Sequence, residues 1–518
     1  MPEQPVTTPQ EVDEKFQALL TNANAARVVA KTVEGTIGPK GLDTMMVDRF
    51  GDVVITNDGV TILKLMEVSH PAARMIINAA KNQQDKVGDG TTTTTIIASN
   101  LVAEGTSQVL KGVPVTKVIE GIALGIKEAE KQVLEIARPV TSLHDPLLYR
   151  IALISARENQ HLADQVMEAA RLTGTEKLMQ DDYNFADAVV ARAGAASSVF
   201  MGVLLNKEPL NRDMPGAVDY PRILVIDDAL EPEQLPEEAL STDTGARYQM
   251  ELDTQFEVHI RRLVEMGVKV VMVDRGVDDR AEEILTEAGV MVLERVSHRE
   301  LLRVCEHTGA RMVKRIALKR DPGDLARCLG QARRVEVNRR HGYTVVMGGE
   351  GKPLATVLVG AATDEVVDEE ERMARDAAAA LQAALKGGMV PGGGACELYL
   401  TLAMENLSRQ VHGMASYGVL CVREALTRPF ACLVANAGFN PLEKLGDVLA
   451  AQSETGNHAL ALDCDRGQVA DMWEIGVVDP VPVKINGLKA AGEVARAILR
   501  INTIVKKKEV AGEEFDFA

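Results

Sequence analysis

The segment Gly88-Asp89-Gly90-Thr91-Thr92-Thr93-Thr94-Thr95 carries the residue types best suited to chemistry in this chain. It places a carboxylate between two glycines and follows it with hydroxyl side chains that open an apolar helix. Glycines let backbone N–H groups approach an anion closely, and a helix that begins near Thr92 adds the positive end of its dipole. Asp89 is a hard oxygen ligand of the kind that Mg²⁺ prefers. The segment therefore suits binding of a phosphate with a metal ion. The alternative interpretation is a threonine-rich helix cap with a surface aspartate, for which the same residues would also be expected.

Three further segments share this character: Gly38-Pro39-Lys40-Gly41, Asn57-Asp58-Gly59 and Gly392-Gly393-Gly394. Glycine loops of a size to hold phosphate thus recur, and a second lone aspartate accompanies them. The chain has no Gly-x-x-x-x-Gly-Lys-Ser/Thr motif and no Gly-x-Gly-x-x-Gly after a strand. A kinase catalytic loop and a Ser-His-Asp arrangement are not readable either. An ordinary P-loop and a dinucleotide fold are therefore excluded as explanations.

The elements that must position these loops are predominantly helical near both ends of the chain. Apolar periodicity predicts a helix over 14–34 that leads into the glycine loop, and further helices over 71–86, 92–110 and 114–138. Residues 53–56 predict a short strand, with Asn57-Asp58-Gly59 as the turn after it. Helical texture returns at 364–386 and continues to about residue 450. The two ends are therefore interpreted as one domain into which the middle is inserted.

The middle of the chain has a different pattern of apolar and polar residues. Residues 141–208 indicate a small connecting domain, and strands alternate with helices from about 221 to 293, which is typical of an α/β domain. Between the first of these strands and its helix lies the acidic, polar segment 228–254. A segment of this length is either a disordered loop or an extended protrusion, and long loops inside compact domains are usually functional.

Composition excludes several classes of protein. The 518 residues suggest three or four domains, and 46% hydrophobic with only 3% aromatic residues indicates cores of small aliphatic side chains. A net charge of −18 argues against nucleic acid as a partner. The six cysteines are scattered and are interpreted as buried apolar residues in a reducing compartment. We expect a soluble, cytoplasmic protein, because residues 1–16 lack a signal pattern and no continuous apolar stretch of about 20 residues occurs.

Seven segments, spread in order over nearly the whole chain, resemble the chaperonins. They resemble most closely the group II type of the archaeal thermosome and the eukaryotic cytosolic complex. The matching segments are 35–43, 55–63, 87–93, 276–279, 366–369, 392–395 and Asn436-Ala437-Gly438-Phe439-Asn440-Pro441.

This resemblance implies a multidomain α+β chaperonin fold. It implies a mostly helical equatorial ATPase domain from 1–141 and 391–518, and a small intermediate hinge domain from 142–208 and 355–390. An α/β apical domain for substrate binding would span 209–354 and carry a helical protrusion, which serves as a built-in lid, near 228–254.

The resemblance also implies a composite site for ATP and Mg²⁺. Nucleotide contacts are expected at Thr36, Ile37, Gly38, Pro39, Asp58, Gly59, Gly88, Gly90, Thr91, Thr92, Thr93, Gly392, Gly393 and Asp479. Gly393 and Asp479 correspond to positions near the ribose and adenine, and Asp89 to the Mg²⁺ ligand. Asp58 and Asp376 match the two carboxylates that position and deprotonate the attacking water, although Asp376 by itself reads as a solvated carboxylate on a helix face. If one of these carboxylates belongs to a moving domain, hydrolysis must await closure.

Some positions depart from the thermosome pattern. Thr44 and Asn159 stand where lysines are expected, which leaves open how the nucleotide state is sensed, and Val478-Asp479-Pro480 looks more like group I. These departures suggest the divergent bacterial branch called group III.

The implied activity is ATP-driven folding of non-native polypeptides inside a homo-oligomer of two stacked eight-membered rings. No separate co-chaperonin cap, nucleic acid or membrane partner is expected. Two alternatives are a phosphotransferase with a small-molecule acceptor and a ring-forming scaffold that has lost hydrolysis, against which Asp58, Asp89 and Asp376 argue. The acidic tail 509–518 is expected to be flexible.

Overall fold

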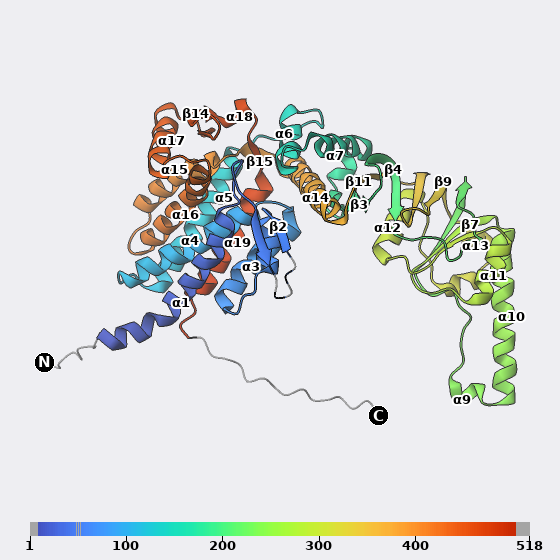
Figure 1. Cartoon of the computed structure of the whole chain (residues 1–518). Coiled ribbons are helices and arrows are strands. Elements are labelled where there is room, and N and C mark those ends of the chain that lie inside the picture. Colours follow the sequence, from blue (N-terminus) through green and yellow to red (C-terminus); the bar gives the residue numbers. More distant parts are fainter. Residues whose placement is uncertain (1–8, 48, 50, 52, 504–518) are drawn as a thin grey trace. The chain divides into compact units, whose positions relative to one another are not determined.

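The computed structural model describes residues 9–47, 49, 51 and 53–503 (Figure 1). The expectations for the N-terminal residues 1–8 and for the acidic tail 509–518 lie outside this part of the chain. The fold divides into two compact units. The first takes its residues from both ends of the chain, up to Ile154 and from Ala379 onward, and the second spans Ser155–Ala378.

The first unit is built mainly from helices (Figure 1). These are α1 (Pro9–Glu34), α2 (Gly59–Leu65), α3 (Pro71–Val87), α4 (Thr91–Leu110), α5 (Val115–Glu135), α6 (Pro146–Ser155), α15 (Ala395–Gln410), α16 (Ala415–Asn436), α17 (Pro441–Thr455), α18 (Met472–Ile475) and α19 (Val481–Leu499). α6 runs across the boundary between the units by one residue. The end of α1 at Glu34, directly before the glycine loop, lies where the apolar periodicity predicted it.

Local sequence explains several helix ends. Pro71 occupies the first turn of α3, where a missing N–H costs nothing, and His70 caps it by accepting a hydrogen bond from Ala72 N–H at 3.2 Å. Asn440 caps α17 in the same way, again followed by a proline.

The core of the first unit consists of small aliphatic side chains, as the composition indicated. α4 lies at its centre and contacts α1, α16 and α19. Leu101, Ile122, Val419 and Ile498 are fully buried where these helices and α5 meet. Both ends of the chain therefore contribute to one hydrophobic core.

Short strand pairs complete the first unit. β1 (Thr44–Val47) and β2 (Val53–Thr56) form an antiparallel hairpin, β12 (Met389–Pro391) pairs with β15 (Val478–Pro480), and β13 (Leu460–Asp463) pairs with β14 (Gln468–Asp471). The strand over 53–56 was predicted, whereas its partner β1 was not. The pairing of β12 with β15 brings the segment that leads into Gly392 beside the strand that carries Asp479.

The second unit is organised around one mixed sheet. Among the described residues, nine strands join it in the order β3-β11-β4-β10-β9-β6-β7-β8, with β5 paired to β9. The strands are β3 (Val189–Ala193), β4 (Ser198–Leu205), β5 (Ala217–Asp219), β6 (Arg222–Ile226), β7 (Val268–Val273), β8 (Met291–Leu293), β9 (Gly330–Asn338), β10 (Tyr343–Gly349) and β11 (Ala355–Ala361). β6, β7 and β8 run parallel, an arrangement typical of the α/β domain that the alternating strands and helices predicted, whereas β4, β9 and β10 pair antiparallel.

Helices join and cover these strands. They are α7 (Gln160–Thr173), α8 (Thr175–Leu178), η1 (Phe185–Ala188), α9 (Glu237–Leu240), α10 (Asp243–Glu265), α11 (Asp279–Glu287), α12 (His298–Thr308), η2 (Arg315–Lys319), α13 (Pro322–Ala326) and α14 (Asp364–Gly387). α14 begins in the second unit and ends in the first.

The acidic segment 228–254 is an ordered protrusion. The chain leaves β6 in extended form, makes the short helix α9 and returns through α10, whose free end stands beyond the sheet (Figure 1). Thr242 caps α10 by accepting a hydrogen bond from Gly245 N–H at 3.0 Å. Of the two alternatives, protrusion and disordered loop, the structure therefore has the protrusion.

The interpretation of all six cysteines as buried residues was wrong for three of them. Cys396, Cys421 and Cys432 are buried, but Cys305, Cys328 and Cys464 are partly exposed. A thiol is small enough to sit at the edge of a helix or turn, so its residue type alone does not fix its burial. No helix in the described ranges combines the length and apolar character needed to cross a membrane.

Candidate functional site

Asp89 lies in a tight turn between two helices of the first unit. α3 ends at Gly88 and α4 starts after Gly90, and both glycines have left-handed backbone conformations, with φ of 73° and 78°. Side chains rarely adopt such angles, which explains why the carboxylate is flanked by glycines. The residue at the N-cap of α4 is Gly90, which has no side chain to accept a hydrogen bond from the first N–H groups of the helix. The first N–H groups of the helix therefore remain available to an anion.

A buried glutamine holds this turn in place. The side-chain Nε2 of Gln83 donates hydrogen bonds to the backbone oxygen of Asp89 at 2.8 Å and to that of Val483, in α19, at 3.0 Å. The Asp89 carboxylate itself accepts a hydrogen bond from Gly90 N–H at 2.5 Å. The turn is thus fixed between α3 and α19.

The electrostatic surroundings of Asp89 favour a cation next to it. Part of its surface reaches solvent, but protein atoms surround the carboxylate densely, and this burial raises its pKa to about 6. This value is the net result of all its surroundings: Asp479 and, more weakly, Asp58 also raise the pKa, whereas Gly90 N–H and Lys484 lower it. An anion that is costly to keep charged gains most from a bound metal ion. Among the described residues, no three His, Cys, Asp or Glu side chains form a metal-binding group; Mg²⁺ commonly needs only one or two carboxylates plus phosphate oxygens.

A pocket opens beside this turn. It is lined by Asp89, Gly90, Thr93, Thr94, Ile97, Cys396, Glu397, Leu400, Asp479, Val483, Lys484, Gly487 and Leu488. One wall is the start of α4, and the other walls are the first turns of α15 and α19. Hydroxyls, a helix N-terminus and a carboxylate on one side form a donor set that fits a phosphate chain with Mg²⁺.

The structure places Gly392 next to Asp479, which lines this pocket, whereas Gly392 itself does not. Asp479 pairs with Val390 between β15 and β12, and Gly392 N–H donates a hydrogen bond to Val477 O at 2.9 Å. A Cβ atom on Gly392 would lie 3.2 Å from the Asp479 carboxyl group. Gly393 is next in the chain and faces Met472 instead, whose sulfur would lie 3.0 Å from its Cβ.

Asp58 and Gly59 open a helix, so the prediction that they form a turn was wrong. Asp58 caps α2 by accepting hydrogen bonds from Val60 N–H and from both the N–H and the hydroxyl of Thr61. Aspartate is favoured at turns and at helix caps for the same reason, its short hydrogen-bonding side chain. A Cβ atom on Gly59 would lie 2.3 Å from the Thr92 hydroxyl oxygen and 3.5 Å from that of Thr91, so the start of α2 packs on that of α4.

The loop with Thr36, Ile37, Gly38 and Pro39 is fixed to α16. Asn436 donates hydrogen bonds from Nδ2 to the backbone oxygens of Glu34 and Ile37, at 2.9 and 3.0 Å. The Thr36 hydroxyl donates to Val33 O at 2.9 Å, which completes the end of α1. These four residues do not line the pocket beside Asp89.

Asp376 lies on α14 within the second unit and is half-buried. It is therefore not among the residues that the first unit assembles. Its neighbour Arg375 pairs with Glu371 at 2.6 Å. Asn159 caps α7 by accepting a hydrogen bond from Leu162 N–H at 3.3 Å. Thr44 pairs with Thr56 in the β1–β2 hairpin.

Sequence reasoning missed three residues at this site. Gln83, Glu397 and Lys484 are buried polar groups with partners distant in sequence. A signal existed for Lys484, because it is the lone charge in the otherwise apolar start of α19. Its partner Glu397 comes three residues after Gly394, in the first turn of α15.

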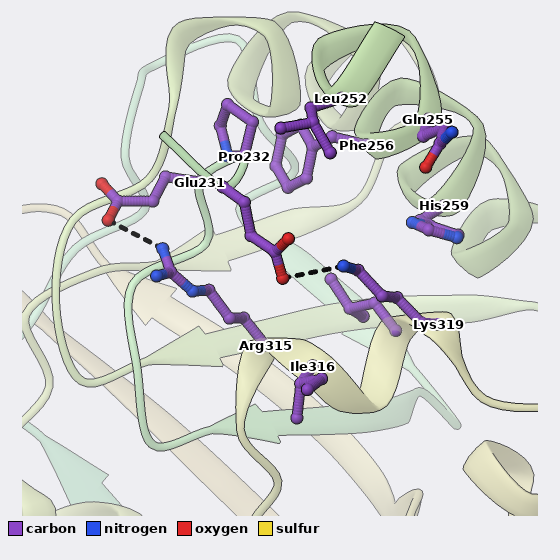
Figure 2. A pocket seen from close by; sticks show the side chains of 11 residues that line it. Glu231, Pro232, Leu252, Gln255, Phe256, His259, Arg315, Ile316 and Lys319 are labelled. Carbon is purple, nitrogen blue, oxygen red and sulfur yellow. Dashed lines mark hydrogen bonds and ion pairs between the residues drawn. The ribbon is translucent and has the colours of Figure 1, made fainter. Parts of the chain in front are cut away.

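A second pocket lies at the base of the protrusion in the second unit (Figure 2). Leu252, Phe256 and His259 from α10 face the extended segment after β6 and the helix η2. Across it, Arg315 pairs with Glu231 at 3.0 Å and Lys319 with Glu233 at 2.7 Å (Figure 2). The charges neutralise one another in pairs, so the arrangement suits fixing the protrusion rather than catalysis.

Comparison with known proteins agrees with these features. The model of the TCP-1/cpn60 chaperonin family matches residues 29–509. The chain is 33% identical to a thermosome subunit of Pyrococcus abyssi over 512 residues, covering 95% of this chain and 92% of that protein. It is also 33% identical to a thermosome subunit of Methanocaldococcus jannaschii, covering 95% and 93% of the two chains.

Among solved structures, a crystal structure of a group III chaperonin in the open state matches with a TM-score of 0.84 and 45% identity. The match covers 95% of this chain and all of that one. The predicted chaperonin fold, the suspected group III likeness and the predicted role in ATP-dependent protein folding are thereby confirmed. This chain belongs to the TCP-1/cpn60 chaperonin family.

Proposed function

We propose that this chaperonin subunit binds ATP with Mg²⁺ at the pocket beside Asp89 and hydrolyses it to drive the folding of non-native polypeptides. The observation that carries the proposal is Asp89 itself, a densely surrounded carboxylate with a raised pKa at the uncapped start of α4. A helix N-terminus and a hard oxygen ligand are what the phosphates and the metal ion of a nucleotide require.

The roles of the remaining residues follow the resemblance, residue by residue. Thr91, Thr92 and Thr93, together with Gly59, Gly88 and Gly90, would contact the phosphate oxygens from the α4 side. Thr36, Ile37, Gly38 and Pro39 would contact the phosphates from the loop after α1. Gly392, Gly393 and Asp479 would bind the ribose and adenine. Mg²⁺, when bound at Asp89, would neutralise charge on the phosphate oxygens.

For hydrolysis, Asp58 would orient the attacking water and Asp376 would accept its proton. Such positioning and proton transfer contribute roughly 10²- to 10⁴-fold to a rate. Asp376 belongs to the second compact unit. If that unit moves during the cycle, as the resemblance implies, hydrolysis would await its closure and would be coupled to motion.

The domain division is proposed on the same basis. An equatorial domain of 1–141 and 391–518, an intermediate domain of 142–208 and 355–390, and an apical domain of 209–354 are compatible with a first unit made from both chain ends. The protrusion of α9 and the free end of α10 would be the built-in lid, so no separate cap is required.

We propose assembly into a homo-oligomer of two stacked rings of eight, as the resemblance implies, and the exposed β1–β2 hairpin supports contact with a neighbouring subunit. Met45 and Ile55 are paired directly in this hairpin and are 63% and 58% exposed. An exposed apolar strand pair is a surface that soluble proteins normally cover. A neighbouring subunit would supply that cover.

The proposal is tested by ATP turnover of the full chain without any small-molecule acceptor, with and without Mg²⁺. We expect Mg²⁺-dependent release of phosphate. Turnover that requires an added acceptor would indicate a phosphotransferase instead. Electron microscopy with and without ATP should show double rings whose lids close with nucleotide, and a stable monomer in ATP would contradict the assembly.

A further inference from the structure

Lys484 joins two carboxylates in the wall of the pocket beside Asp89. Its Nζ lies 2.6 Å from Glu397 Oε1 and 2.6 Å from Asp479 Oδ2. The side chains of Lys484 and Glu397 are only 11% and 4% exposed, whereas Asp479 is 30% exposed. The three charges thus run from the interior of the first unit to the pocket surface, and the nucleotide roles described above use only Asp479.

The charge on Lys484 is strongly maintained. Burial acts to lower its pKa, but the attraction of Asp479 and Glu397 outweighs burial and holds the pKa well above its usual range. The second oxygen of Glu397 is buried, and the described residues offer it no hydrogen-bond partner. Glu397 therefore depends on Lys484 for compensation of its charge.

Such an arrangement needs a reason, because buried ion pairs are seldom kept for stability alone. The backbone of Asp479 is fixed by its pairing with Val390, and Gly392 lies against its carboxyl group. With one oxygen bound to Lys484, the carboxylate has little freedom to rotate. Lys484 thus restrains Asp479, the partly exposed one of the two carboxylates, where it lines the pocket.

We propose that Lys484 is a positioning residue for the nucleotide. It holds Asp479 so that the carboxylate accepts hydrogen bonds from the ribose hydroxyls, and Glu397 keeps Lys484 in place. A carboxylate only accepts hydrogen bonds and repels phosphate, so hydroxyl donors are its natural partners. The inference rests on the nucleotide binding proposed above, and it adds which residues recognise the ribose hydroxyls.

The test is equilibrium binding of ADP and of 2′,3′-dideoxy-ADP to the full chain, with Mg²⁺, by calorimetry. The wild-type chain should prefer ADP by about tenfold or more, the change expected for hydrogen bonds to a charged group. In Lys484→Met this preference should fall toward one. Lys484→Arg, which keeps the cation, should retain most of it. Asp479→Asn should also reduce the preference.

Lys489→Met is the matched control, because Lys489 lies on the same helix but pairs at the surface with Glu130, at 3.3 Å. It should leave the preference unchanged. Lys484→Met alone leaves the buried carboxylate of Glu397 without its cation. The double variant Lys484→Met/Glu397→Met therefore removes both charges and replaces them with apolar side chains of similar volume. Melting of each variant without nucleotide checks its folding.

The outcomes separate the two proposals. An ADP preference that persists in a folded Lys484→Met or double variant would overturn the positioning role. A wild-type chain that binds ADP and its dideoxy form equally would overturn it too, and leave the nucleotide site intact. A wild-type chain that binds neither would overturn the site and this inference together.

Discussion

The side chain of Gln83 donates a hydrogen bond to the backbone oxygen of Val483, 400 residues later in the chain. The same Nε2 atom donates to Asp89 O, so one amide connects the helix from the N-terminal segment, the aspartate turn and the helix from the C-terminal segment. The composite site therefore depends on a contact between the two ends of the chain.

Replacing Gln83 tests this dependence. Gln83→Ala should remove the side-chain donor from the carbonyl oxygens of Asp89 and Val483, of which the second is buried, and reduce the stability of the first unit by about 1–3 kcal/mol. It should also weaken Mg²⁺-dependent ADP binding, because the turn at Asp89 loses its support. Thermal melting and calorimetry measure the two effects. Asn82→Ala, at an exposed position of the same helix, is the control and should change neither.

The raised pKa of Asp89 predicts a pH dependence in the acidic range. Its pKa of about 6 means that the carboxylate binds a proton where an ordinary aspartate is already ionised. Below pH 6, Mg²⁺-dependent ADP binding should therefore weaken by up to about tenfold per pH unit, and above pH 7 it should level off. The pH profile of Asp89→Asn serves as the control, because protonation of the nucleotide itself affects both proteins equally. Equal pH profiles for the wild type and this variant would remove Asp89 as the metal ligand.

The same shift has a consequence for the metal-free protein. Between about pH 4 and pH 6 the folded chain holds a proton on Asp89 that the unfolded chain has released. Raising the pH through this window should therefore destabilise the wild type relative to Asp89→Asn. Melting temperatures without metal, compared at pH 5 and pH 7, measure this difference. A difference of the opposite sign would contradict the raised pKa.

Asp376 is expected to act in hydrolysis and not in binding. Asp376→Ala should lower the single-turnover rate of ATP hydrolysis by roughly 10²- to 10⁴-fold and change ADP affinity little. Asp368→Ala is the control, because Asp368 is an exposed aspartate earlier on the same helix. Unchanged turnover in Asp376→Ala would exclude Asp376 from the mechanism.

The base of the protrusion allows a charge-swap test. Glu233 and Lys319 are each 46% exposed and pair at 2.7 Å (Figure 2). The hydrogen bond and charge of Lys319 lower the pKa of Glu233, so the pair is complete at neutral pH and is lost as the pH falls through the acidic range of carboxylates. Lys319→Glu should speed hydrogen exchange in 231–236, and Glu233→Lys/Lys319→Glu should restore it. The effect of one exposed pair is small, up to about 1 kcal/mol, and should shrink at high salt.

If exchange in 231–236 is unaffected by Lys319→Glu, this ion pair does not fix the protrusion. The hydrogen bonds from Gln249 to Glu233 O and from Leu235 N–H to Gln249, both 2.9 Å, would then hold the segment together with the Arg315–Glu231 pair.

Much of the fold could be predicted because apolar periodicity is local. The helices over 71–86 and 364–386 were predicted within a residue of their observed bounds. The first half of α10 was predicted only through the resemblance and not by periodicity, since a helix that stands in solvent needs no apolar stripe and its acidic residues resemble a loop. β1 was missed because strand propensity is weak in four mostly exposed residues whose partner is needed to define them.

The candidate site divides in the same way. The turn around Asp89 was recognised because its glycines and threonines are consecutive. The pair of Glu397 and Lys484 was not, because the two residues are 87 positions apart and meet only when α15 and α19 begin side by side at the β12–β15 pair. Asp58 shows a further limit, since a turn and a helix cap favour the same residue types.

The exposed hairpin gives a test of assembly. Met45 and Ile55 oppose each other across β1 and β2, so Met45→Lys/Ile55→Asp places two charges on the surface proposed to meet a neighbouring subunit. The new charges can pair with each other, so the hairpin itself should survive while its apolar contact is lost. We expect smaller species than rings in sedimentation velocity, with ADP still bound. Leu134→Asp, at an exposed position on α5, controls for added surface charge. Intact double rings in the hairpin variant would place the subunit contact elsewhere on the chain.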